Sequence, residues 1–228
     1  METTASTGQI QSARPPLQAA TRHLPVFTAA EFQYPAQLPR GNRVVCKFIG
    51  RTVMKIVGWR VAGSLPDCPK MVISIAPHTT NWDFPLGVMV MWALDLRLTF
   101  AGKHSLFFWP FSVWLKAIGG IPVDRRAANG LVGALVAEFA ARDKLIYALS
   151  PEGTRTLTAG FRSGFLHVAR QANVPIVLGY FDFEQRVIAF DKVYIPSGAA
   201  PEQVAFDLAQ MVNFYRPIKG KYRKQWQQ

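Results

Sequence analysis

Short apolar runs alternate with longer amphipathic stretches along most of the chain. Continuous apolar runs such as MVISIA and KLIYALS have strand length and no polar alternation, which is typical of parallel strands buried on both faces. The predicted strands are residues 71–78, 97–102, 119–125, 144–150, 174–183 and 186–195. The predicted helices are residues 83–94, 127–142, 163–172 and a last helix that begins near Pro201. This order predicts an α/β fold with a mostly parallel sheet flanked by helices, and with functional residues at strand ends.

A different pattern precedes the first buried strand, between residues 43 and 61. Basic residues recur there at every fourth position, and apolar residues fall mainly on the other side of the same helix. The basic residues are Arg43, Lys47, Arg51 and Lys55. This pattern predicts an N-terminal basic amphipathic helix. Two interpretations stay open: its apolar face packs on the core, or it dips into a bilayer, where each cation near an anionic leaflet contributes about 1 kcal/mol.

The first 40 residues differ in composition from the rest of the chain. They are rich in Ser, Thr, Ala, Gln and Pro, and five prolines interrupt any regular period. We therefore expect residues 1–40 to form a disordered tail and residues 41–228 to form a single domain. The opening residues also lack the basic and apolar segments of a secretory signal.

The net charge of the chain is +12, so we expect an anionic partner. A nucleic acid is disfavoured because the basic residues lie beside apolar stretches and no DNA- or RNA-binding motif is present. An anionic membrane surface fits better, and residues 105–118, SLFFWPFSVWLKAI, are a second candidate for membrane contact. The longest nearly uncharged apolar stretch, 84–94, is shorter than the roughly 20 residues of a spanning helix. We therefore predict a peripheral protein on the cytoplasmic face of a membrane.

The first candidate for chemistry is the segment PHTTNWD, in which His78 and Asp83 are separated by four residues. On a continuous helix this spacing places the two side chains about 140° apart, so they can meet only across a turn. Pro77 at the strand end and Asn81 or Asp83 as a helix cap favour such a turn. A carboxylate that binds one ring nitrogen leaves the other nitrogen as a base. The alternative is a structural histidine that only caps a helix.

A second motif, PEGTRT, follows the predicted strand 144–150. Its glycine, threonine and arginine offer backbone N–H groups, a hydroxyl and a guanidinium, which together suit a phosphate group. Further cations near strand ends are Lys103, Arg125 in the segment IPVDR, and Arg162 in FRSG. Taken singly, each of these can equally be a turn or a solvated surface charge.

Four motifs in this order resemble the lysophosphatidic acid acyltransferase family. They are HTTNWD (His78 to Asp83), GIPVDR (Gly120 to Arg125), PEGTR (Pro151 to Arg155) and VPIV (Val174 to Val177). The resemblance covers residues 70 to 180 and implies the glycerolipid acyltransferase type of α/β fold. It implies that His78 and Asp83 are catalytic. It also implies that an acceptor phosphate is bound by Arg125, Glu152, Gly153, Thr154 and Arg155, with Lys103 and Arg162 as looser counterparts.

The resemblance further implies an O-acyltransferase of phospholipid synthesis. Acyl-CoA or acyl-carrier protein would be the co-substrate, and a lysophospholipid such as 1-acylglycerol-3-phosphate would be the acceptor, with no bound cofactor or metal. The sequence departs from the family pattern at Pro77, Thr80 and Ser150, where Asn, Ser and Phe are usual. These departures leave open an aminolipid or glycolipid acceptor, thioester hydrolysis, or a catalytically silent membrane-binding protein.

Overall fold

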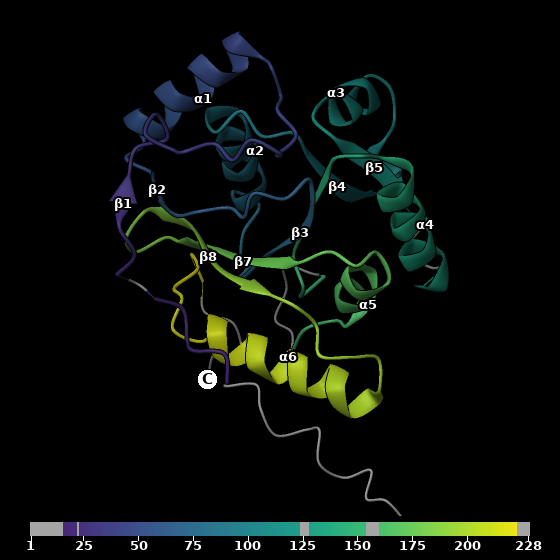
Figure 1. The fold of residues 1–228 in the computed structure, drawn as a ribbon. Helices are drawn as coiled ribbons and strands as arrows, with labels where there is room; N and C mark the ends of the chain where they lie inside the picture. Colours follow the sequence, from purple (N-terminus) through teal and green to yellow (C-terminus); the bar gives the residue numbers. More distant parts are fainter. Residues whose placement is uncertain (1–15, 22, 124–127, 154–159, 223–228) are drawn as a thin grey trace, which may run out of the picture.

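The computed structural model describes residues 16–21, 23–123, 128–153 and 160–222 as one sheet with helices on both faces (Figure 1). The strands are β1 (Val26–Phe27), β2 (Arg60–Gly63), β3 (Lys70–Ile75), β4 (Leu98–Lys103), β5 (Gly120–Val123), β6 (Leu145–Leu149), β7 (Ile176–Asp182) and β8 (Val187–Tyr194). The helices are α1 (Val44–Ile56), α2 (Asp83–Ala93), α3 (Phe111–Ala117), α4 (Ala128–Ala141), α5 (Gly164–Gln171) and α6 (Pro201–Tyr215), with a short 3₁₀ turn, η1 (His104–Leu106). The predicted α/β class is confirmed.

The eight strands follow the order β1-β2-β8-β7-β3-β6-β4-β5. Strand β3 lies at the centre and pairs in parallel with both β6 and β7, and β4 pairs in parallel with β6 and β5. Strands β7 and β8 form a hairpin, because they are consecutive and β8 runs antiparallel to β7. Parallel pairing brings the carboxyl ends of β3, β4, β5, β6 and β7 to one edge of the sheet, where loops carry functional groups in such folds.

Two apolar clusters form the core, one on each face of the sheet. Side chains of α4, α5 and α6 contribute to one cluster, and side chains of α1, α2 and α3 contribute to the other. Strand β3 serves both, since Val72 points into the first cluster while Met71 and Ile73 point into the second. All three residues are fully buried or nearly so. This explains why the strand reads as a continuous apolar run in the sequence.

The predicted basic helix is shorter in the structure than its sequence pattern suggested. Helix α1 ends at Ile56, and Gly58 then adopts a left-handed conformation with φ of +72°. Residues 60–63 form β2, which pairs with β8 and so draws the end of the pattern into the sheet. Among the described residues, no helix combines the length and the apolar character that crossing a bilayer requires.

Residues 16–21 and 23–40 differ from the predicted disordered tail, while residues 1–15 and 22 lie outside the described part. Strand β1 pairs with β2, and the N–H of Ala20 donates to the carbonyl of Phe214 on α6. Leu38 is only 2% exposed. The prolines of this segment prevent a helix, but the apolar residues between them still pack on the domain.

Candidate functional site

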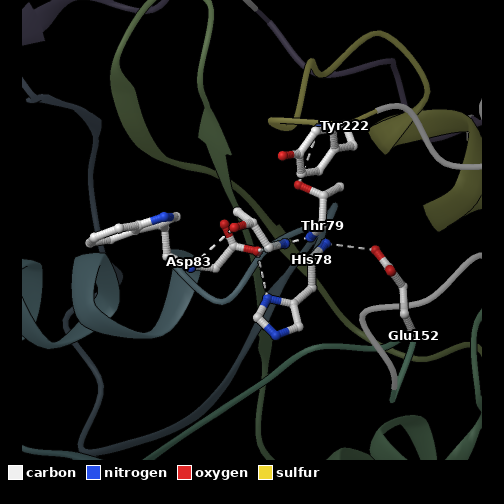
Figure 2. A network of polar contacts seen from close by, with 7 residues as sticks. His78, Thr79, Asp83, Glu152 and Tyr222 are labelled. Carbon is white, nitrogen blue, oxygen red and sulfur yellow. Dashed lines mark hydrogen bonds and ion pairs between the residues drawn. The ribbon is translucent and has the colours of Figure 1, made fainter.

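The site begins with the loop that links β3 to α2. Strand β3 ends at Ile75, and α2 begins at Asp83, so the loop contains His78 and the carboxylate opens the helix. The Nδ1 atom of His78 lies 2.8 Å from Oδ2 of Asp83. The turn that the spacing required is therefore present, and the two side chains meet (Figure 2).

One oxygen of Asp83 binds three groups of the loop. Besides the His78 ring, Oδ2 accepts hydrogen bonds from the N–H groups of Thr79 and Thr80, at 2.8 and 3.0 Å. The Asp83 side chain is 2% exposed, whereas that of His78 is 26% exposed. An ionised carboxylate accepts only, so Nδ1 carries a proton and Nε2 keeps its lone pair. The site thus has an imidazole base at the protein surface, oriented by a buried anion.

Glu152 supports the same loop from the turn that follows the neighbouring strand β6. Its Oε1 atom accepts a hydrogen bond of 2.8 Å from the backbone N–H of His78, and the residue is 1% exposed (Figure 2). A buried carboxylate is suited to bind N–H groups and would repel a phosphate. The geometry therefore shows that Glu152 fixes the backbone of His78, and its contact with an acceptor phosphate stays a prediction.

Gly153 and Arg162 lie together beside Glu152. Gly153 has φ of +66°, a region that disfavours side chains, and a Cβ there would lie 2.9 Å from Cδ of Arg162. The backbone N–H of Arg162 also donates to the carbonyl of Pro151 at 2.8 Å. The exposed guanidinium of Arg162 thus belongs to the same sheet edge as His78.

Several predicted phosphate contacts fall outside the described residues. These are Arg125, Thr154 and Arg155. The backbone of Lys103 forms the end of β4 at the edge that carries His78, but its side chain is not described. The structure therefore brings His78, Asp83, Glu152, Gly153 and Arg162 together.

A cavity of about 360 Å³ lies elsewhere, at the opposite edge of the sheet. It adjoins the starts of β4 and β5 and the ends of α2 and α3, and its lining includes Arg43, Arg97, Lys116 and Arg142. Cations are stabilised at helix C-termini, and Arg43 donates to the carbonyl of Ala117 at the end of α3. Arg43 thus caps α3, and the cavity is separate from the His78 site.

Residues 216–222 also contribute to this site, which no motif in the sequence predicted. The N–H of Tyr222 donates to Oγ1 of Thr79 at 3.4 Å (Figure 2). Nζ of Lys221 lies 5.9 Å from the ring centroid of Trp82. Tyr222 and Thr79 are 143 positions apart, so no local pattern in the sequence could reveal the contact.

Together, the parallel sheet and the His78–Asp83 pair at its carboxyl edge have the geometry that general base catalysis requires. The model of the Acyltransferase family matches residues 64–178, just over half of the chain, and this span includes His78, Asp83 and Glu152. The chain belongs to the Acyltransferase family and is an acyltransferase. The acyltransferase family that the four motifs predicted is thereby confirmed.

A solved structure is also similar to this chain. It is the crystal structure of the 1-acyl-sn-glycerophosphate (LPA) acyltransferase PlsC from Thermotoga maritima, with 17% sequence identity and a TM-score of 0.47. The similarity covers 79% of this chain and 80% of the other. A comparison with curated proteins found no match.

Proposed function

We propose that this acyltransferase moves a fatty acyl group from acyl-CoA or acyl-carrier protein to a hydroxyl of a lysophospholipid, such as 1-acylglycerol-3-phosphate. The observation that carries the proposal is the His78–Asp83 pair, which leaves Nε2 as a base on a partly exposed ring at the sheet edge. The four ordered motifs favour a phosphorylated acceptor. The nucleophile in this reaction is the hydroxyl of the acceptor itself.

In the proposed reaction, Nε2 of His78 takes the hydroxyl proton while the acceptor oxygen attacks the thioester carbonyl. A C–O bond forms, and the carbonyl electrons move to the oxygen of a tetrahedral intermediate. Asp83 stabilises the imidazolium through the 2.8 Å contact with Nδ1. When the intermediate collapses, the C–S bond breaks and the thiolate leaves with the proton from His78. A base of this kind contributes typically about 10²- to 10⁴-fold.

Cations near the base support a phosphate on the acceptor. Among the described residues, Arg162 lies against Gly153 beside the loop that carries His78. Arg125, Thr154, Arg155 and Lys103 are the further candidates from the sequence motifs. A guanidinium binds a phosphate through paired, charge-assisted hydrogen bonds, which makes Arg162 the first of these residues to test.

We also propose that the enzyme works as a peripheral protein on the cytoplasmic face of an anionic membrane. The apolar side of α1 is largely exposed, and Val44, Val45, Phe48 and Ile56 are between 71% and 82% exposed. A second exposed group around η1 and α3 comprises Leu106, Phe108, Trp109, Phe111, Val113 and Trp114. Monomeric proteins rarely expose so much apolar surface, which marks a binding surface.

An aromatic contact links this exposed surface to the base. The ring of Phe84, next to Asp83 in the chain, lies 6.3 Å from that of Trp114 on α3 and 5.3 Å from that of Phe100 on β4. A lipid that rests against α3 would therefore meet the first turn of α2 on its way to the site. This arrangement supports an acceptor that is delivered from the bilayer.

The experiment is an acyl-transfer assay on vesicles, with labelled acyl-CoA and acyl-carrier protein as donors and a panel of lysophospholipid, aminolipid and glycolipid acceptors. We expect wild-type turnover with a phosphorylated acceptor and loss of turnover in His78→Ala. Equal turnover in His78→Ala would remove the base, and turnover only with acceptors that lack phosphate would replace the proposed substrate.

The phosphate contact has its own matched pair of variants. Arg162→Gln should raise the KM for the phosphorylated acceptor by about tenfold, because a charge-assisted hydrogen bond contributes about 1.5–3 kcal/mol. Arg142→Gln is the control, since Arg142 pairs with Glu138 on α4 at the opposite sheet edge. The same KM in both variants would argue against phosphate binding by Arg162.

A further inference from the structure

The last described residues of the chain turn back to the edge of the sheet that carries His78. After α6 ends at Tyr215, residues 216–222, here the C-terminal segment, run toward the loop after β3. Ile218 is 1% exposed, and the carbonyl of Lys219 accepts a 3.0 Å hydrogen bond from the N–H of Phe183. Nζ of Lys219 also lies 2.7 Å from a carboxylate oxygen of Glu184. The segment is thus fixed to the end of β7.

Gly220 places this segment directly on the catalytic loop. A Cβ at this position would lie 2.8 Å from Cγ2 of Thr79 and 2.9 Å from Cγ of Pro77, closer than Cβ atoms approach other groups. Gly220 is not one of the glycines with positive φ, so its backbone would accept alanine without strain. Space alone therefore requires glycine here.

Thr79 connects the C-terminal segment to the base. Its hydroxyl faces the segment and accepts the N–H of Tyr222, while its own N–H donates to Oδ2 of Asp83 at 2.8 Å. The same Oδ2 binds Nδ1 of His78. Any shift of Thr79 therefore reaches the ring of His78 through one shared oxygen atom.

We propose that the C-terminal segment is a positioning element, in which Gly220 and Tyr222 hold Thr79 so that Asp83 aligns the His78 ring. This inference rests on the proposed role of His78 as the base. The segment touches no reacting atom, so its effect is on the rate of the chemical step and not on the binding of the acceptor. A segment that only covers the sheet end would affect stability and leave the turnover of folded enzyme unchanged.

The test is a double-mutant cycle between Gly220→Ala and Thr79→Ser. The added methyl group should displace Thr79 and lower kcat by about ten- to a hundredfold at unchanged KM, as expected when a catalytic group is misplaced by a fraction of an ångström to 1 Å. Serine removes Cγ2, the atom nearest to the added Cβ, and keeps the hydroxyl. The loss caused by Gly220→Ala should therefore be smaller in the Thr79→Ser background.

Gly133→Ala is the matched control, because Gly133 lies on α4 with nothing within 4 Å of an added Cβ. It should retain the wild-type kcat. The proposal is overturned if folded Gly220→Ala keeps the wild-type kcat, or if Thr79→Ser does not reduce its effect. Should Gly220→Ala not fold, Thr79→Val tests the same link without added bulk, and an unchanged kcat there also overturns the proposal.

A second measurement separates this inference from the proposed function. The proton on Nδ1 of His78, held by Asp83, should give a far-downfield proton NMR signal that His78→Ala removes. We expect Gly220→Ala to shift or broaden this signal, whether or not the enzyme turns over. The double variant should restore it in part, because the contact of the added Cβ with Pro77 remains. An unaltered signal in Gly220→Ala would overturn the positioning role. If Gly220→Ala alters the signal but the wild-type enzyme shows no acyl transfer, only the proposed reaction is overturned.

Discussion

Glu152 binds the backbone of His78, because its Oε1 atom lies 2.8 Å from the amide nitrogen of that residue. Asp83 holds the ring of the same residue, so two buried carboxylates fix one histidine at both ends. The geometry of a base depends on such supporting groups as much as on the base itself. The PEGTR motif therefore contributes to the loop that carries His78 through its glutamate.

Replacing Glu152 should separate hydrogen bonding from charge. Glu152→Ala leaves the N–H of His78 without this acceptor in a buried place, which should cost about 1–3 kcal/mol of unfolding free energy and lower kcat. Glu152→Gln keeps an acceptor oxygen, so its unfolding free energy and its kcat should both fall less. Denaturant unfolding and initial rates check the order, and an equal loss in the two variants would contradict it.

Asp83→Asn should leave the loop folded, because an amide oxygen in the place of Oδ2 can still accept from the ring of His78 and from the N–H groups of Thr79 and Thr80. The neutral amide lacks the negative charge that stabilises the imidazolium. We therefore expect kcat to fall by about 10²- to 10⁴-fold with a smaller change in melting temperature. A kcat within twofold of the wild type would show that the charge of the carboxylate does not assist the base.

The membrane surface can be tested with two phenylalanines of similar chemistry. Phe48 on α1 is 71% exposed and Phe206 on α6 is 43% exposed, on helices that cover opposite faces of the sheet. Burial of a Phe side chain in lipid contributes about 1.5–3 kcal/mol, so Phe48→Ser should weaken binding to anionic vesicles by about tenfold or more. Phe206→Ser should bind vesicles like the wild type in co-sedimentation. An equal loss of vesicle binding in the two variants would show that the membrane surface is not confined to the side of α1.

Asp191 on β8 gives a pH dependence of stability. Burial raises the pKa of this carboxyl, against the N–H of Thr21 and the ammonium of Lys192, which lower it. A raised pKa in the folded state favours the protonated form, so this contribution is present at low pH and is lost as the pH rises through the raised pKa. Asp191→Asn should match the wild type near pH 4 and melt higher at neutral pH. A lower melting temperature at neutral pH would contradict the sign.

Local sequence patterns predicted the buried strands and the contact between His78 and Asp83. The buried strands β3, β6 and β7 were evident because apolar runs of strand length report burial on both faces. The His78–Asp83 contact was predictable because the two residues lie within one loop, where proline and a helix start impose a turn. The short strands β1 and β2 were missed, since pairing with distant partners decides them and their own sequence does not.

Contacts between distant parts of the chain could not be read from the sequence. The bond from His78 to Glu152 joins residues 74 positions apart, and it depends on β3 and β6 being neighbours. For α1 the periodicity was correct, but it left two partners open for the apolar side. In the structure, Gly50 and Met54 pack inward while Phe48 and its neighbours face outward. Only the packing against α2 reveals this division.

The outward apolar side of α1 also affects how the protein behaves once it is removed from cells. In aqueous buffer, these side chains have only each other to cover them, so purified chains should self-associate through α1. Mild detergent should disperse the aggregates by occupying the same side chains. An oligomer seen only in detergent-free buffer would then be a product of purification, and its size would say nothing about the enzyme at work.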